Sequence, residues 1–114
     1  MALTREYKET VVARISRDSA FAQALYAEAL DALLAGETAE GLSMLRDLVH
    51  ASISFKALAQ QTGFDEKMLH RTLSSRGNPT ARTLAKIVAA IRGDLGFVPT
   101  VHVAMARFRT EAIG

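Results

Sequence analysis

The chain has 114 residues, 49% of them hydrophobic, which is enough for one compact domain with a buried core. It contains no cysteine, which excludes a disulfide framework and a thiolate metal site. No apolar run approaches the roughly 20 residues that a bilayer-spanning helix needs, and the N-terminal residues lack a signal-peptide pattern, so we expect a cytoplasmic protein without membrane contact.

Charge is distributed unevenly along the chain, although the formal net charge is only +2. Residues 1–53 contain five basic and eight acidic side chains, residues 54–92 contain seven and two, and residues 93–114 contain two of each. The basic middle segment fits a surface that faces nucleic-acid phosphates, because Lys and Arg release counterions condensed on the polyanion. Charge alone equally allows a solvated basic face that binds nothing.

Hydrophobic spacing predicts three helices in the acidic N-terminal segment, the first over residues 4–16. Asp18 is suited to cap a second helix that stops at Gly36, where a left-handed backbone is favourable. Thr38 is the candidate cap of a third helix, although Gly41 stands where a capping box has Glu or Gln. The apolar stripe expected on the second helix consists of Phe21, Leu25, Ala29 and Leu33.

Three more helices are predicted in the basic segment. Ser54 is suited to cap a short helix that ends at Gly63, and Asp65 is suited to cap the next one. The turn-rich residues 74–79 then precede a longer helix that opens at Thr80. The expected fold is therefore mainly α, a compact helical bundle.

The character of the sequence changes after Gly96. Val98, Val101 and Val103 belong to a β-branched stretch that Pro99 interrupts, which predicts a short C-terminal strand or arm within residues 93–114. Because an isolated strand is unstable, we expect it to pair, and a second copy across a dimer axis is one way to do so.

Residues 54–92 are predicted to form a helix-turn-helix. In this motif two short helices cross steeply, so the seam between them needs a small residue and the turn needs a residue that tolerates positive φ. Ala59 and Gly63 meet these needs. The second helix would enter the DNA major groove, which is about 12 Å wide. Its buried side would be anchored by Phe64, Leu69 and Thr72.

The outward side of that second helix supplies the candidate DNA-reading residues Glu66, Lys67, Met68, His70 and Arg71. They offer two cations, an acceptor for cytosine N4 and an apolar contact for the thymine methyl group. The alternative is a solvated helix exterior for Lys67, His70 and Arg71, and inward packing for Met68.

The same segment resembles the lambda-repressor/Cro-like helix-turn-helix family, also called the XRE family. The resemblance rests on Leu58-Ala59, Gly63, Leu69, Pro79 and the run from Thr83 to Ile91. It implies a DNA-binding regulator with this motif as its reading head.

Two positions depart from that family. Phe55 stands where many members have a phosphate-contacting Gln, and Leu73 stands where many have a Glu. Those contacts therefore cannot be transferred to this chain. We expect phosphate contacts instead from Arg76, Asn78 and the backbone amides around Ser54, since helix N-termini and loop cations often take this role.

The whole chain is similar to HigA-like antidote proteins of toxin–antitoxin modules. Residues 3–11, 27–36 and 77–81 carry this similarity. It implies an antitoxin that binds its own operator and a small RNase-type toxin. The acidic, amphipathic N-terminal segment is a suitable surface for a basic toxin, because complementary charge speeds association and suppresses wrong partners.

Catalytic, cofactor and metal sites are not predicted. His50, His70 and His102 lack the spacing of metal ligands, and no HExxH, GxGxxG or Walker pattern occurs. The Glu28–Asp31 pair is interpreted as a solvated helix face rather than as catalytic carboxylates. We therefore expect a protein that is not an enzyme and needs no cofactor.

Three hypotheses remain open from the sequence. The leading one is a homodimeric repressor whose recognition helices lie about one duplex turn apart, roughly 34–36 Å, on a pseudo-palindromic operator. The second is an interaction module that mainly neutralises a toxin, with DNA binding secondary or lost. The third is a helical bundle that mimics the motif and binds neither.

Overall fold

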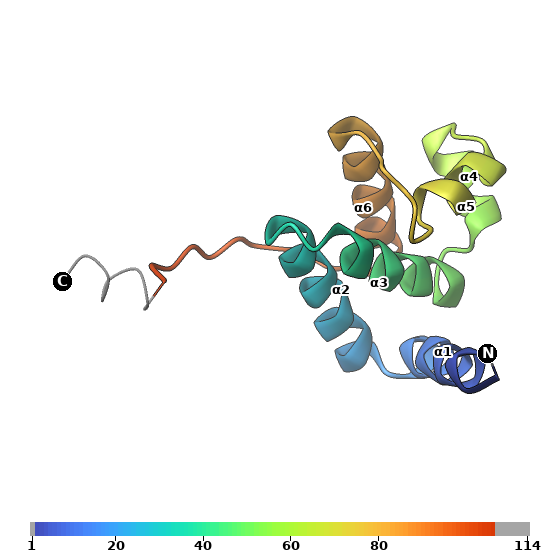
Figure 1. Cartoon of the computed structure of the whole chain (residues 1–114), viewed down its shortest axis with the longest axis horizontal. Helices are drawn as coiled ribbons and strands as arrows, with labels where there is room; N and C mark the ends of the chain where they lie inside the picture. The colour runs from blue at the N-terminus through green and yellow to red at the C-terminus, as the bar shows by residue number, and fades with distance from the viewer. Residues whose placement is uncertain (1, 107–114) are drawn as a thin grey trace.

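The computed structural model describes residues 2–106, and it describes side chains from Glu9 onward. Six helices lie in this range, α1 Ala2–Arg17, α2 Ser19–Leu34, α3 Thr38–Ala51, α4 Phe55–Thr62, α5 Glu66–Thr72 and α6 Ala81–Leu95 (Figure 1). The expected mainly α bundle is confirmed.

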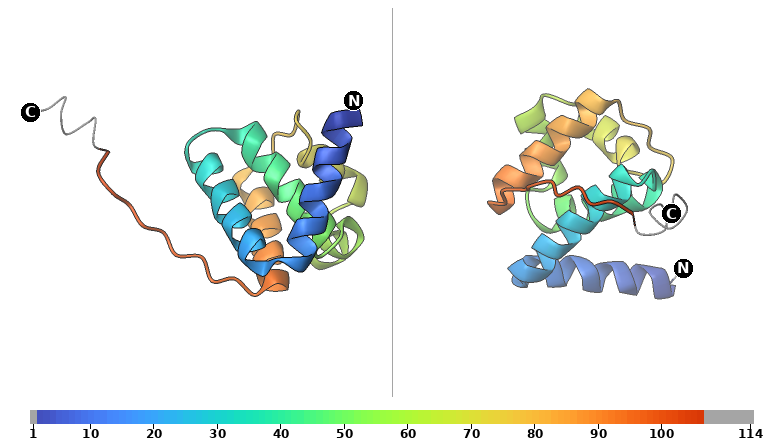
Figure 2. Two further views of the ribbon diagram at one scale, coloured as in Figure 1. Left: turned by 90° about the horizontal axis from the view of Figure 1, so that it is seen from below. Right: turned by 90° about the vertical axis from the view of Figure 1, so that its left-hand side faces the viewer.

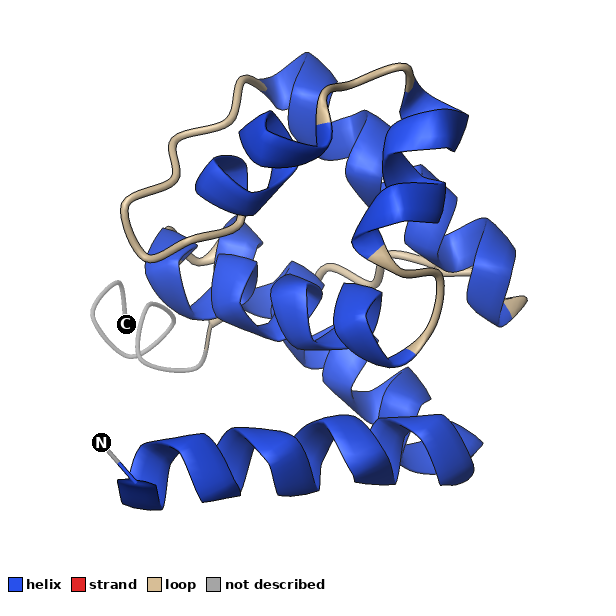
Figure 3. Ribbon diagram, turned by 90° about the vertical axis from the view of Figure 1, so that its right-hand side faces the viewer, coloured by secondary structure: helices blue, strands red, loops and turns tan. Residues whose placement is uncertain are grey.

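Helix α3 occupies the middle of the bundle. It lies between α1 on one side and the α4–α6 group on the other, and α2 packs along it (Figures 1 and 3). A single hydrophobic cluster extends from Ile15 to Ile91, so the segments 1–53 and 54–92 share one core. Its fully buried large side chains are Leu42, Leu45, Leu48, Val49, Leu58, Leu69, Leu73, Ile87 and Ile91.

Side-chain caps begin four of the helices, as the sequence predicts. The caps are Asp18, Ser54, Asp65 and Thr80, and each accepts a hydrogen bond from a backbone N–H of the first helical turn. The N–H of Phe21 holds the pKa of the Asp18 carboxyl below its ordinary value. The prediction for Thr38 is wrong, because Glu37 occupies the N-cap of α3 without a side-chain hydrogen bond and Thr38 is the first helical residue.

Gly41 allows α3 to approach α2 closely. A Cβ atom at this position would lie 2.7 Å from Cγ of Leu33 and 3.2 Å from the carbonyl oxygen of Ala29. Contacts this short require the neighbouring atoms to move. The glycine that weakens the capping box in the sequence therefore serves the packing of the two helices.

Tyr26 is the largest buried side chain on α2, and the predicted stripe missed it. The buried residues of this helix are Ala22, Tyr26, Ala29 and Ala32, whereas Phe21 and Leu25 are half-buried. The Tyr26 hydroxyl donates a hydrogen bond to the carbonyl oxygen of Val88, at 3.2 Å, and so ties α2 to α6.

The expected C-terminal strand is absent from the described residues. Residues 97–106, hereafter the arm, leave the end of α6 as extended chain without a strand partner (Figure 2). Tyr26 holds the base of the arm, since its ring centroid lies 5.6 Å from that of Phe97. Residues 107–114, the remainder of the predicted arm, lie outside the described residues.

Candidate nucleic-acid interface

Helices α4 and α5 meet at the corner that the sequence predicts. Gly63 ends α4 with φ of 78°, and its N–H donates to the carbonyl oxygen of Ala59 at 2.9 Å. Ala59 is half-buried against the core, as a residue at a close helix crossing should be. Phe64 follows in the turn, and the ammonium group of Lys86 lies 5.3 Å from its ring centroid, which links the corner to α6.

One side of α5 anchors the helix in the core. Leu69 and Leu73 have no exposed surface, and Phe64 and Thr72 are half-buried. The capping carboxylate of Asp65 fixes the start of the helix by accepting the N–H of Met68 at 3.2 Å. This anchoring sets which side of α5 faces solvent.

The opposite side of α5 is open and cationic. Glu66, Lys67, His70 and Arg71 are exposed, and Met68 is half-buried. Within the described part of the chain, the side chains of Lys67 and Arg71 make no hydrogen bond or ion pair. Both cations are therefore available to an external anion or base edge.

Three of the predicted reading residues, Glu66, Met68 and His70, also contact their neighbours. The imidazole of His70 stacks on the ring of Phe55, with centroids 3.9 Å apart and planes 13° from parallel. The Glu66 carboxylate lies 3.9 Å from Nε2 of His70. The hydroxyl of Thr72 donates to Sδ of Met68 at 3.1 Å. His70 thus holds α5 against the start of α4 in addition to being exposed.

Phe55 is the residue whose role the sequence did not reveal. It is 5% exposed, and besides His70 it contacts His50 of α3, whose ring centroid lies 4.9 Å away. Its ring forms an aromatic platform that joins α3, α4 and α5. The sequence feature that indicates this role is a large apolar residue directly after a capping serine.

Ser54 adopts a strained backbone conformation, with φ of 78° and ψ of 155°, and is the one non-glycine residue of positive φ in residues 2–106. Its flanking residues Ile53 and Phe55 are both buried, and its N–H donates to the carbonyl oxygen of Val49 at 2.9 Å. These three contacts fix the chain direction where α3 passes into α4. Strain of this kind is often found at functional positions.

Replacing Ser54 with glycine is expected to raise the free energy of unfolding by about 1 kcal/mol. Relief of roughly 1–3 kcal/mol of backbone strain outweighs the few tenths lost when glycine replaces a capping serine. The matched control is Ser54→Ala, which keeps the strain and loses the cap, and should lower stability by about 1 kcal/mol. Urea unfolding measures both. A Ser54→Gly protein as unstable as Ser54→Ala would show that this backbone is not strained.

The loop after α5 presents the remaining candidate contacts. Arg76 and Asn78 are exposed, and the Arg76 side chain makes no hydrogen bond or ion pair with the described residues. Gly77 between them packs so tightly on the end of α5 that an added Cβ would overlap the carbonyl oxygen of Thr72. The loop is therefore held at the C-terminal end of α5, and its cation lies beside that helix.

The basic segment folds onto one side of the molecule. Its helices α4, α5 and α6 all lie across α3 from α1 (Figure 3). All seven of its cations are exposed on these helices and the adjoining loop, namely Lys56, Lys67, Arg71, Arg76, Arg82, Lys86 and Arg92. The separation of charge along the sequence thus becomes a separation in space.

Comparisons with protein-family models, curated proteins and solved structures gave no match to this chain. Within the described residues there is no cluster of three or more His, Cys, Asp or Glu that could hold a metal ion. The helices of that same range all fall short of the length and apolar character needed to cross a membrane. The functional interpretation rests on the geometry of α4, α5 and the loop that follows.

Proposed function

We propose that the chain is a sequence-specific DNA-binding regulator that inserts α5 into the major groove. The observation that carries this proposal is the two-sidedness of α5, which buries Leu69 and Leu73 completely while Lys67 and Arg71 stay exposed and unpaired within the described chain. A helix about 10–12 Å across fits the major groove. No side chain of α5 is both buried and charged, and the Glu66–His70 pair on this helix is exposed, so contact with DNA disrupts no buried ion pair.

Each residue has a defined part in this complex. Lys67 and Arg71 contact base edges or adjacent phosphates, and Glu66 accepts a hydrogen bond from cytosine N4. Met68 offers an apolar contact to the thymine methyl group, and His70 borders the reading surface. Ser54 at the start of α4, and Arg76 and Asn78 in the loop after α5, contact the phosphate backbone and set the register of the helix in the groove. Two copies on a pseudo-palindromic site would place two such helices on one face of the duplex.

Binding to DNA from immediately upstream of the protein's own coding region tests this function. Fluorescence anisotropy compares that duplex with a scrambled duplex of equal length and composition. We expect tighter binding to the upstream duplex and a steep loss of affinity as salt rises from 50 to 200 mM, because phosphate contacts release counterions. Equal affinity for both duplexes would contradict sequence-specific regulation. Absence of binding at low salt would favour a bundle that only mimics the motif.

A groove on the far side of α3 favours a second role, that of an antitoxin. It measures about 490 Å³, and its floor includes the half-buried Val11, Phe21, Leu25 and Met44. Exposed Glu28 and Glu40 lie on its border. Apolar surface edged by carboxylates suits a basic, amphipathic partner, and complementary charge would speed its capture. We propose that a small basic toxin encoded beside the protein binds here, and that the complex represses its own operator.

Co-purification with the product of the adjacent gene tests the antitoxin role. The variant Glu28→Lys/Glu40→Lys reverses two exposed charges at the groove and should lose the partner while keeping its affinity for upstream DNA. A matched control, Asp31→Lys/Glu37→Lys, reverses two exposed acids outside the groove lining. If the double variant still binds the partner, the groove is not the toxin-binding site. If the wild-type protein does not bind the product of the adjacent gene, the antitoxin role is wrong.

A further inference from the structure

The strongly exposed large hydrophobic residues of the described chain lie mostly in the arm. They are between 73% and 85% exposed, and they are Leu34, Val98, Val101, Val103 and Met105. Four belong to the arm, and Leu34 ends α2, along which the arm begins. Isolated exposed apolar residues are ordinary on protein surfaces, whereas a contiguous group marks an interaction site.

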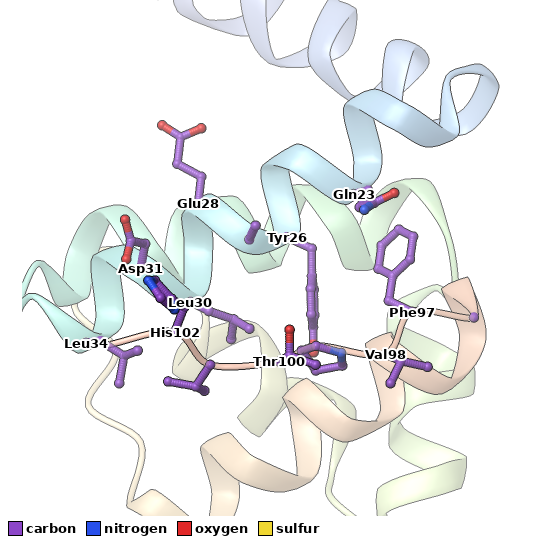
Figure 4. Close-up of a pocket in the computed structure, with 14 residues that line it drawn as sticks. Gln23, Tyr26, Glu28, Leu30, Asp31, Leu34, Phe97, Val98, Thr100 and His102 are labelled. Carbon is purple, nitrogen blue, oxygen red and sulfur yellow. The ribbon is translucent and has the colours of Figure 1, made fainter. Parts of the chain in front are cut away.

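The arm borders a groove with α2. The groove measures about 800 Å³, and Figure 4 shows Phe97, Val98, Thr100 and His102 beside the α2 residues that form its other wall. Beyond this groove the arm extends away from the bundle (Figure 2). Only Phe97 among residues 97–105 uses a backbone N–H internally, donating to the carbonyl oxygen of Arg92 at 3.1 Å. The backbone groups of residues 98–105 are therefore free to pair with another chain.

The sequence of the arm has the pattern of a strand with two different faces. From Thr100 onward, Val101, Val103 and Met105 alternate with Thr100, His102 and Ala104. Because side chains of a strand point to opposite faces in turn, the three large apolar residues share one face. Pro99 lacks an N–H and cannot donate within a ladder, so pairing would begin at Thr100.

The arm also lacks the features that keep unpaired strands apart. Exposed strand edges in monomeric proteins are usually protected by charged side chains, inward lysines or short length. Residues 97–106 contain no Asp, Glu, Lys or Arg, although 23% of the whole chain is charged. Two copies of this arm would meet without charge repulsion and with matching apolar faces.

From these observations we infer that the arm is a dimerisation strand, and that its partner is residues 100–105 of a second copy in an antiparallel ribbon. An antiparallel pair of identical strands has a two-fold axis, so the assembly closes at two chains. Val101 and Val103 then lie near this axis and face the apolar residues of the other copy. The pairing depends on the arm alone, while its effect on operator affinity rests on the proposed function.

Analytical ultracentrifugation of the full chain, without DNA, tests the ribbon. We expect a dimer, and we expect Val101→Glu/Val103→Glu to raise its dissociation constant by about 100-fold or more, because opposed carboxylates replace buried valines. Both side chains are exposed in the described chain, so the helix content and melting temperature should not change. The matched control is Gln60→Glu/Gln61→Glu, which adds the same two negative charges at exposed positions of α4, outside the arm, and should remain dimeric. A monomeric wild-type chain, or a dimer that survives the double substitution, would overturn the inference.

The register of the two paired arms can also be measured, because the chain has no cysteine of its own and an introduced one is the only thiol. Single cysteines placed in turn at residues 100 to 105 should form intermolecular disulfides fastest at one position near the two-fold axis, with rates falling on both sides. Similar rates at all positions, as in a parallel pair, would contradict the antiparallel ribbon. Because neither readout involves DNA, failure of the ribbon leaves the DNA-binding proposal intact, and failure of operator binding leaves the ribbon intact.

Discussion

Replacing Arg71 with alanine is expected to weaken binding to the upstream DNA by about 1–3 kcal/mol, which is the range for losing a cation that contacts a base edge. Arg71 is exposed and without a side-chain partner in the described chain, so the substitution breaks no internal contact. Lys67→Ala should also lose affinity, and if Lys67 contacts a phosphate, the slope of log affinity against log salt should fall by about one.

The control for these variants is Arg17→Ala, which removes an exposed cation from the end of α1, across α3 from the proposed interface. It lowers the net charge by the same amount as Arg71→Ala, so any difference between the two reports position rather than total charge. Melting temperatures of all three variants should match the wild type. Equal losses of affinity in Arg17→Ala and Arg71→Ala would mean that α5 is not the contact surface.

Replacing Leu69 with alanine is expected to lower the free energy of unfolding by about 2–5 kcal/mol, the range for a fully buried leucine. Leu69 has no exposed surface and is the residue that fixes α5 to the core. A domain of this size has only about 5–15 kcal/mol of stability, so a large part would be lost. Urea denaturation followed by circular dichroism gives the value.

Leu84→Ala supplies the comparison for this prediction. The helical spacing of Leu84 with Ile87 and Ile91 predicts that Leu84 is also a core residue, but the structure leaves it half-buried at the edge of the hydrophobic cluster. Removing the same atoms from a partly exposed site leaves a smaller cavity. Leu84→Ala should therefore lower the free energy of unfolding clearly less than Leu69→Ala does. If Leu69→Ala and Leu84→Ala lower the free energy of unfolding equally, burial of Leu69 is not what anchors α5.

Features that depend on local chemistry could be predicted from the sequence. The hydroxyl or carboxyl oxygens of Asp18, Ser54, Asp65 and Thr80 reach N–H groups only a few residues away, so their capping roles depend little on the rest of the fold. Gly63 likewise ends α4 because of its own backbone freedom. At α3 the same reasoning chose Thr38, one residue away from the observed cap at Glu37.

Features that depend on distant partners could not be predicted. The stack of Phe55 and His70 joins residues that no sequence spacing relates, and the positive φ of Ser54 follows from burial of both its neighbours. The valines of the arm have the propensity for a strand, but propensity forms a strand only with a partner, and one chain offers none within its described residues. The exposed side of α5 was predicted because the anchoring leucines and the cations recur at helical spacing.

The most direct test of the central claim is a chemical-shift map of the labelled protein titrated with the upstream duplex. We predict that the largest amide shifts fall on residues 66–71, with further shifts at Ser54 and at residues 76–78, while the groove on the far side of α3 is unchanged. Largest shifts on α1 and α2, with α5 unaffected, would contradict the account.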